Sequence, residues 1–251
     1  MSILTDSHIA YVNLGIRPDR NEHMRRELDK AGIKAWRFDA YEPEPTIEKV
    51  GADRVQRMID TTPGAIGCMY SQMSIMLNAH RGRKHAMVLE DDVVFCSDFK
   101  ERLHEFTTFI PNRWDILWLG ATFHKEPTWH NISHRKDFPC NCILNRDWEH
   151  TNHPNIVRTY GCWSTYAYIV NCASIPKVTL MLSEFMPQTI GIDYSMIYFQ
   201  PELLTYAFVP GMVKQYDNES NIGKGKTIFS NFSRLGEHWW ADKWDKEKKY
   251  I

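Results

Sequence analysis

The chain has 251 residues, 43% of them hydrophobic and 24% charged, which is near the average for soluble globular proteins and enough for a sizeable core. The formal net charge of −1 gives no overall field that would attract nucleic acid or an anionic membrane. The sequence shows no secretory signal and no hydrophobic run of the roughly 18 residues that span a bilayer. We therefore expect a cytoplasmic protein, with a peripheral position at the inner face of a membrane as the alternative.

The first forty residues are typical of a β-α-β unit. His8–Asn13 is a short apolar run rich in β-branched and aromatic residues, which predicts a buried strand followed by a turn. Asp19–Lys30 is charged and predicts a surface helix, which Gly32 ends as a C-cap. Lys34–Phe38 predicts a second strand, so the chain opens in the manner of a parallel sheet.

The middle of the chain continues this alternation. The pattern predicts, in order, a polar segment Tyr41–Pro63 with a short helix near Glu48–Ile59, a long helix from Pro63 to about His80, a buried strand Ala86–Leu89, a helix capped by Ser97 and Asp98 that ends near Phe109, and a strand Trp114–Leu119.

Residues 121–158 have no clear period and are rich in His, Asn, Asp and Arg, which indicates a functional loop. Regular patterns then return as a strand Thr165–Val170, helices Ser174–Leu182 and Ile192–Phe199, and a strand-like run Leu203–Val213, before a polar tail 218–251. The sequence has no internal repeat and no linker between two cores. We expect one α/β domain over 1–251, with a mostly parallel sheet.

The strongest chemical signal is the acidic triplet Glu90-Asp91-Asp92 at the carboxyl end of an apolar strand. In open α/β sheets the ligand crevice lies outside such strand ends. Adjacent carboxylates repel one another, and a divalent cation offsets this repulsion because hard cations prefer oxygen ligands. Such a cation also clamps a diphosphate. The alternative is a solvated acidic turn or a helix N-cap cluster.

Two further groups are candidates for the same site. Asp193 follows Gly191 at the start of a predicted helix, where it would take a proton from an acceptor hydroxyl or would serve only as an acid favoured by the helix dipole. Asn13-Leu14-Gly15, with Arg17 and Arg20, follows the first strand. This turn would receive a nucleotide base or phosphate, unless the two arginines are ordinary surface charges.

Two other groups of residues invite a functional interpretation. Cys140, Cys142, His150 and His153 suggest zinc, although their spacing does not match the usual ligand pairs. Trp239, Trp240 and Trp244 would stack on sugars or nucleobases, or would pack as apolar rings against the body of the protein. Without a secretory signal we expect the six cysteines to be reduced thiols.

The order of these motifs resembles glycosyltransferase family 25, which includes bacterial lipooligosaccharide galactosyltransferases and collagen hydroxylysine galactosyltransferases. The resemblance is spread over most of the chain. It rests on the opening strand and Arg-rich turn, the helix start, the acidic motif, the strand after it, two later blocks and a closing block: Ala10–Arg20, Gly64–Ser71, Val88–Val93, Trp114–Gly120, Tyr166–Val170, Gly191–Asp193, and Val213–Gln215 with Ser220–Ile222.

The resemblance implies a GT-A fold, with helices on both faces of the sheet, and an inverting transfer of galactose or glucose from a UDP-sugar to a hydroxyl of a glycan or glycolipid. Asp92, with Asp91 or Glu90, would hold Mn²⁺ or Mg²⁺ against the diphosphate, and Asp193 would be the general base. The donor would contact residues of the first turn, the helix start and the closing block: Asn13, Leu14, Arg17, Arg20, Gly64, Ser71 and Gln215. Residues 121–158 match nothing in the family and would govern the acceptor.

Two positions depart from the family pattern. Gln72 stands where the family usually has His, and Asn221 stands where it usually has an acid. These departures leave open a binding protein without turnover on the same scaffold. A metal-dependent phosphohydrolase is a second alternative, although it would need further His or Asp ligands. Within the enzyme interpretation, a protein hydroxyl or a modified nucleobase also remains open as acceptor.

Overall fold

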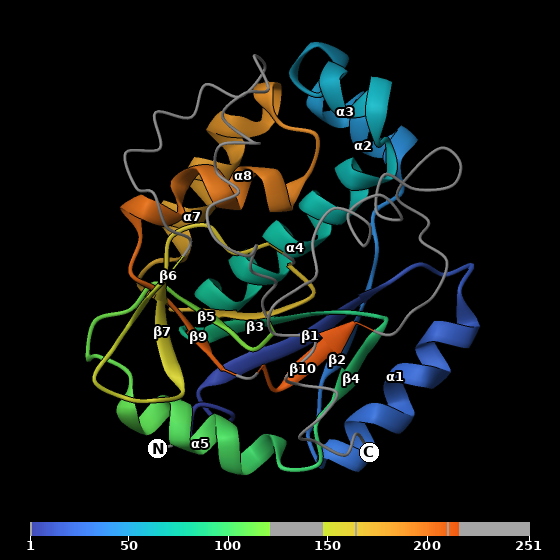
Figure 1. The fold of residues 1–251 in the computed structure, drawn as a ribbon. Helices are drawn as coiled ribbons and strands as arrows, with labels where there is room; N and C mark the ends of the chain where they lie inside the picture. Colours follow the sequence, from blue (N-terminus) through green and yellow to red (C-terminus); the bar gives the residue numbers. More distant parts are fainter. Residues whose placement is uncertain (1, 121–147, 164, 210, 216–251) are drawn as a thin grey trace, which may run out of the picture.

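The computed structural model describes residues 2–120, 148–163, 165–209 and 211–215 (Figure 1). At its centre is a sheet of eight described strands in the order β2-β1-β3-β8-β5-β9-β7-β6. Strands β7 and β8 run opposite to the other six, as their antiparallel pairings require. In chain order the strands are β1 (Ser7–Asn13), β2 (Trp36–Asp39), β3 (His85–Glu90), β5 (Ile116–Trp118), β6 (Trp148–His150), β7 (Ile156–Thr159), β8 (Ala167–Val170) and β9 (Thr205–Phe208).

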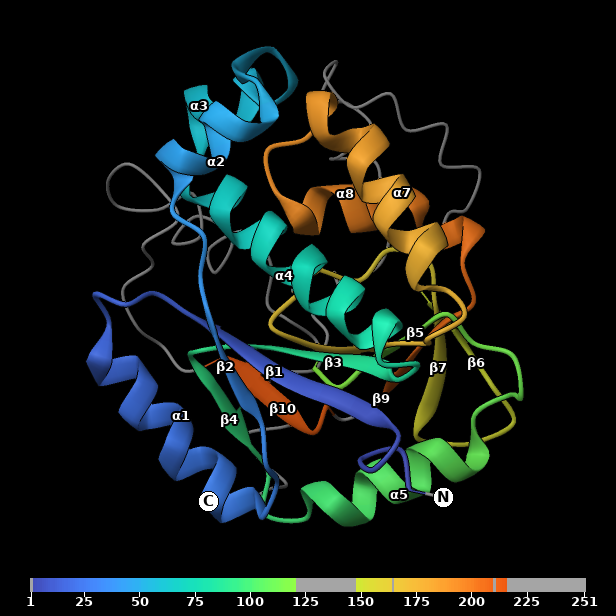
Figure 2. The ribbon, with the colours of Figure 1, turned by 180° about the vertical axis from the view of Figure 1, so that it is seen from behind.

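Helices cover both faces of this sheet, as Figures 1 and 2 show from opposite sides. On one face lie α4 (Gly64–Arg81), α7 (Ile175–Phe185) and α8 (Ile192–Phe199). On the other face lie α1 (Pro18–Ala31) and α5 (Phe99–Phe109). The short helices α2 (Pro43–Val50) and α3 (Gln56–Thr61) lie beside the first turns of α4. The expected α/β architecture, with a mostly parallel sheet between two helical layers, is confirmed.

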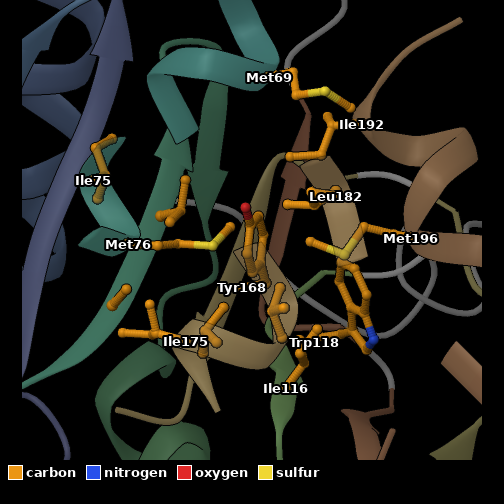
Figure 3. Packing of buried hydrophobic residues seen from close by; sticks show 14 of the residues in the cluster. Met69, Ile75, Met76, Ile116, Trp118, Tyr168, Ile175, Leu182, Ile192 and Met196 are labelled. Carbon is orange, nitrogen blue, oxygen red and sulfur yellow. The ribbon is translucent and has the colours of Figure 1, made fainter. Parts of the chain in front are cut away.

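The two faces divide the core according to the strand period of two. Ala10 and Val12 of β1 belong to the cluster under α4, while Ile9 and Tyr11 belong to the cluster under α1 and α5. Figure 3 shows the α4 cluster, in which Tyr168 and Trp118 lie with their ring centroids 5.4 Å apart. Because the central strands are buried on both faces, they read in the sequence as continuous apolar runs.

Local signals explain α1 well. Pro18 stands in its first turn, where a missing N–H costs nothing, and Asp19 follows it near the positive end of the helix dipole. Met24 and Leu28, four residues apart, are both buried against the sheet. Gly32 ends the helix in a left-handed conformation with φ 61°, as the sequence predicts.

The structure corrects three details of the sequence prediction. The aperiodic segment 121–158 contains β6 and the start of β7, so its last part belongs to the central sheet. The run Leu203–Val213 divides between β9 and β10 (Val213–Gln215), and β10 pairs in a separate sheet with β4 (Val93–Phe95), which the pattern did not predict. The polar segment before α4 holds two short helices instead of one. The strands β4, β6 and β10 have three residues each and show too little pattern to be seen without their partners, whereas β5, equally short, lies within a longer apolar run.

Candidate active site

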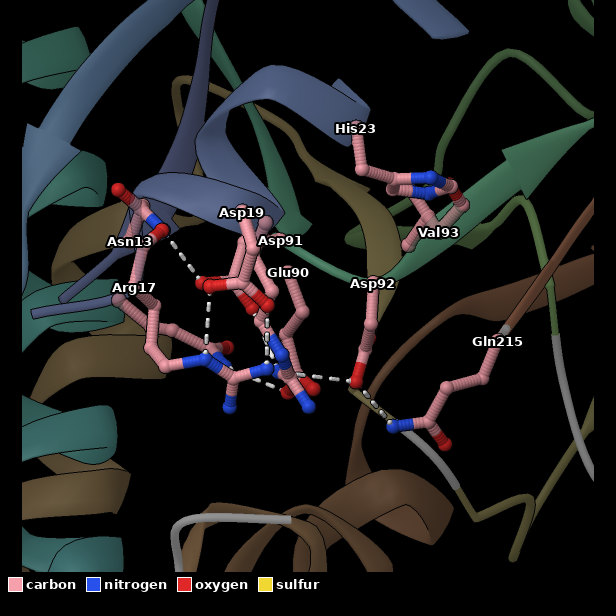
Figure 4. A network of polar contacts seen from close by, with 11 residues as sticks. Asn13, Arg17, Asp19, His23, Glu90, Asp91, Asp92, Val93 and Gln215 are labelled. Atoms are coloured by element: carbon pink, nitrogen blue, oxygen red, sulfur yellow. Dashed lines mark hydrogen bonds and ion pairs between the residues drawn. The ribbon is translucent and has the colours of Figure 1, made fainter. Parts of the chain in front are cut away.

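The acidic triplet lies where β3 ends, beside the first turn of α1 (Figure 4). Asp91 and Asp92 are buried, with 8% and 5% of their surface exposed. Arg20 of α1 reaches both carboxylates, with its Nη1 2.7 Å from Asp91 Oδ1 and 3.3 Å from Asp92 Oδ2. Arg20 is therefore not a surface charge. Its guanidinium offsets part of the repulsion between the carboxylates. The sequence by itself assigned that role to a divalent cation alone.

Asn13 fixes Asp91 from the opposite side. Its Nδ2 donates to Asp91 Oδ2 at 2.7 Å and to the Arg17 carbonyl at 3.1 Å, while its Oδ1 accepts from Arg37 Nε at 2.8 Å. Both oxygens of Asp91 thus have protein partners. Arg17 pairs with Asp19 instead, at 2.8 Å, and this contact lowers the pKa of Asp19 to about 2. The hydrogen bond between Asn13 and Asp91 thus connects the predicted nucleotide turn to the triplet.

Asp92 differs from Asp91 in having one carboxylate oxygen left over. Its Oδ2 accepts from Gln215 Nε2 at 3.1 Å as well as from Arg20. Its Oδ1 is buried and has no hydrogen-bond partner among the described residues. Burial raises the pKa of Asp92, and the Arg20 guanidinium opposes that shift. Leaving a buried carboxylate oxygen without a hydrogen-bond partner costs free energy.

Glu90, the first acid of the triplet, belongs to a polar chain on the α4 side of the sheet. Its Oε1 accepts from Gln72 Nε2 at 3.2 Å, and Gln72 Oε1 in turn accepts from the Tyr168 hydroxyl at 2.7 Å. Burial, together with the charges of Asp92 and Asp193, raises the pKa of Glu90 well above its usual range. Glu90 therefore holds its proton more readily than an exposed glutamate does.

Asp193 stands in the first turn of α8 and is oriented by one residue. Its Oδ1 accepts from the Thr165 backbone N–H at 3.0 Å and from the Thr165 hydroxyl. Burial raises the pKa of Asp193, and these hydrogen bonds oppose the shift. The charge of Asp193 is one cause of the raised pKa of Glu90, so the fold has brought this helix-start acid within electrostatic range of the triplet, about 100 residues away in the sequence.

Comparison with known proteins agrees with this arrangement. The family model of glycosyltransferase family 25, described as LPS biosynthesis protein, matches residues 7–196. The chain belongs to glycosyltransferase family 25. The matched span includes the acidic triplet, Gln72, Thr165 and Asp193, whereas β9, β10 and Gln215 follow it.

Individual relatives are more distant. A human protein named inactive glycosyltransferase 25 family member 3 is 32% identical over 126 residues, covering 45% of this chain and 21% of its own. A glycosyltransferase 25 family member of Drosophila melanogaster is 28% identical over 138 residues, covering 50% and 22%. A putative glycosyltransferase of Acanthamoeba polyphaga mimivirus is 25% identical over 171 residues, covering 65% and 49%. The chain matches only about a fifth of the length of the two animal relatives.

Among solved structures, mouse xyloside xylosyltransferase 1 in its apo form is similar at 12% identity and a TM-score of 0.33, with 78% of this chain and 62% of that chain covered. Within the described part of the chain, no helix has the length and apolar character needed to cross a membrane.

The family's helix-start motif has a structural role here. Ser71 is completely buried, donates to the Gly67 carbonyl at 2.6 Å and accepts from the Tyr41 N–H at 2.9 Å. A Cβ on Gly67 would lie 2.0 Å from the Tyr41 carbonyl oxygen, so only glycine fits. The N–H groups of Ala65 and Ile66 are already bonded within the turn. The motif thus packs α4 against the preceding segment, and the donor contacts of Gly64 and Ser71 stay predictions.

Leu14 also has a structural role, since its carbonyl accepts the Arg17 N–H at 2.9 Å and closes the turn after β1. The residues that sequence reasoning missed are mainly those that orient others: Gln72, Thr165, Tyr168 and Arg37. Gln72 had a signal, because it departs from the family pattern. Thr165 and Arg37 had none, since their roles depend on contacts between distant segments.

Cys140 and Cys142 lie outside the described residues, as do Asn221, Trp239, Trp240 and Trp244. His150 and His153 are described and lie against aromatic rings, those of Trp148 and Phe109. In the described ranges, no three His, Cys, Asp or Glu side chains form a metal-ligand cluster. The four described cysteines are free thiols.

Proposed function

We propose that this family 25 chain is a glycosyltransferase that transfers a hexose, galactose or glucose, from a UDP-sugar to an acceptor hydroxyl with inversion at the anomeric carbon. The observation that carries the proposal is the buried Oδ1 of Asp92 at the carboxyl end of β3, which has no hydrogen-bond partner among the described residues. The neighbouring Asp91 has both oxygens occupied by Arg20 and Asn13. The carboxylate of Asp91 is thus held by the protein, whereas that of Asp92 has an oxygen that would bind a ligand.

Asp92 would hold Mn²⁺ or Mg²⁺ through this oxygen, with Asp91 close by. A carboxylate is the ligand type that these cations prefer. When bound, the cation neutralises the diphosphate of the departing nucleotide. The protein's part is to keep Asp92 ionised and fixed. Arg20 favours its charged form, and the amide of Gln215 donates to its other oxygen.

Asp193 would take the proton from the attacking hydroxyl. Thr165 donates to Oδ1 of Asp193 through both its N–H and its hydroxyl, which leaves Oδ2 as the basic oxygen. The raised pKa of Asp193 suits a general base, because a base is most effective when its pKa approaches the working pH. A glycan or glycolipid hydroxyl is the acceptor that the family description, LPS biosynthesis, favours.

A second candidate is a sugar-nucleotide-binding protein without turnover. The word inactive in the name of the human relative supports it, and so does Gln72 at a position where the family usually has His. The two functions differ in turnover but agree in donor binding. An assay of UDP release separates them.

Titration calorimetry with UDP-galactose and UDP-glucose tests the metal site. Wild-type protein should bind one of these donors only with Mn²⁺ or Mg²⁺ present, and Asp92→Ala should weaken that binding at least about tenfold, since a ligand to a buried cation is lost. Asp29→Ala, at an exposed position of α1, is the control and should bind normally. Equal donor affinity before and after chelation would contradict the proposed metal site at Asp92.

A further inference from the structure

A pocket lies at the far edge of the sheet from the acidic triplet. It has a volume of about 570 Å³, within the range of small-ligand sites. The end of α5, the β6–β7 hairpin and β9 surround it, and its lining includes Phe109, His150, Asn152, His153, Arg158 and Tyr206. Figures 1 and 2 both place this hairpin and the α1 end of the molecule on opposite sides.

One wall of the pocket is a fixed guanidinium. Arg158 lies between two aromatic rings, 5.1 Å from the centroid of Tyr160 and 5.5 Å from that of Tyr206. It also donates to the backbone carbonyls of Leu203 and Thr205. A guanidinium held in this way loses little side-chain entropy when it binds a ligand.

The lining also offers an aromatic surface. Phe109, at the end of α5, is 58% exposed although its side chain is apolar. Its ring stacks on the imidazole of His153, with centroids 4.7 Å apart and planes at 27°. Such a ring gains free energy when a flat, weakly polar group covers it.

The charges of the pocket indicate the class of ligand. Arg158 is balanced by Glu149 in the same lining, and His153 lies 3.5 Å from Glu105 Oε1. This balance gives no excess of positive charge for a phosphate or polyanion. The polar side chains, in turn, do not suit a lipid tail. Hydroxyl-rich ligands with apolar ring faces match a surface that combines aromatic rings with hydrogen-bonding groups.

We propose that this pocket binds a neutral saccharide and holds a distal part of the acceptor. Three strands separate β3 from β7 in the sheet, so the pocket lies about four strand spacings, roughly 19 Å, from the triplet. It is too far away to present the attacking hydroxyl, and it would instead anchor sugar units away from the one that reacts. The acceptor role rests on the proposed function, whereas saccharide binding by the pocket does not.

The test uses the full chain and three neutral disaccharides, lactose, cellobiose and maltose, with binding followed by ligand-observed NMR. At least one should bind with a dissociation constant of the order of 1 mM, and Phe109→Ala should raise that constant about fivefold through loss of the ring contact. Asn152→Ala, which removes a polar lining group, should weaken binding as well. Leu180→Ala is the matched control, because Leu180 is also 58% exposed but lies on α7.

Binding should persist in Asp92→Ala and after chelation, so a failure of the donor site would leave this result intact. The proposal is overturned if none of the three sugars binds, or if Phe109→Ala and Leu180→Ala bind equally well. It is also overturned if Asp92→Ala abolishes binding while Phe109→Ala does not, because the sugar would then occupy the carboxylate site.

Discussion

Asp91 and Asp92 are the same residue type and adjacent in the sequence, yet their surroundings give them different hydrogen-bond partners. Asp91 receives Arg20 on one oxygen and Asn13 on the other, so its charge supports the local structure. Asp92 shares Arg20 but keeps Oδ1 without a described partner. The chemistry of the triplet thus depends on single hydrogen bonds that no spacing rule in the sequence specifies.

At the same scale, Asp193→Asn tests the proposed base. Asn keeps an oxygen for the two Thr165 donors, so the variant should fold and bind donor nearly as well as the wild type. It cannot accept the proton, and steady-state kinetics should show turnover reduced roughly 10²–10⁴-fold. Glu184→Gln, at an exposed position of α7, should leave turnover unchanged. A variant that melts earlier yet turns over at a near wild-type rate would identify Asp193 as a helix-start acid only.

At the scale of elements, the site is assembled by segments that approach one strand end from several directions. Helix α1 brings Arg20 to the triplet, α8 brings Asp193, and β10 brings Gln215. The approach of β10 depends on Gly120, where a Cβ would lie 2.3 Å from the Val213 carbonyl oxygen. Each segment packs through its apolar face and carries one polar residue to the common point.

The link between α1 and β3 predicts a large effect of Arg20→Ala on stability. The side chain of Arg20 is 11% exposed, and its removal leaves the buried carboxylates of Asp91 and Asp92 without the guanidinium that pairs with them. Breaking a buried pair in this way costs about 3 kcal/mol or more. Chemical denaturation should show that loss, whereas Arg25→Ala on the same helix, at a 71% exposed side chain, should change stability by less than about 0.5 kcal/mol. Equal losses in both variants would contradict the buried-pair role.

At the scale of the whole molecule, the two helical layers contribute different residues to the site. Glu90, Gln72 and Asp193 lie on the side covered by α4 and α8, and Arg20 comes from the α1 layer. Burial, together with the charges of Asp92 and Asp193, raises the pKa of Glu90, and burial also raises the pKa of Asp193. A concentration of buried carboxyl groups makes the stability of the entire fold depend on pH.

The sign of that dependence follows from Glu90. Its pKa is higher in the folded than in the unfolded chain, so the folded protein binds more protons and loses stability as pH rises from about 4.5 through the folded-state pKa. Glu90→Gln removes this penalty and keeps an oxygen for Gln72. Denaturation curves should therefore coincide at pH 4 and show the variant as the more stable protein at pH 7.5. A less stable variant at pH 7.5 would mean that folding favours the charged carboxylate.

The sequence by itself determined the α/β class, the first β-α-β unit, the position of α4, and the acidic triplet at a strand end. These features come from short-range physics: hydrophobic periodicity, helix caps, and the placement of polar residues directly after buried runs. The resemblance of ordered motifs gave family 25, which the family match over residues 7–196 confirms.

Only the tertiary structure decided which residues meet. The sequence left Arg17 and Arg20 equivalent, and packing sent one to Asp19 and the other to the triplet. The contact between Ser71 and the Tyr41 backbone, thirty residues apart in the chain, is likewise visible only in the folded protein. Strands β4, β6 and β10 are three residues long and take their form from their neighbours. The physical reason is the same throughout, because partners far apart in the chain are selected by the free energy of packing and hydrogen bonding, which no local pattern records.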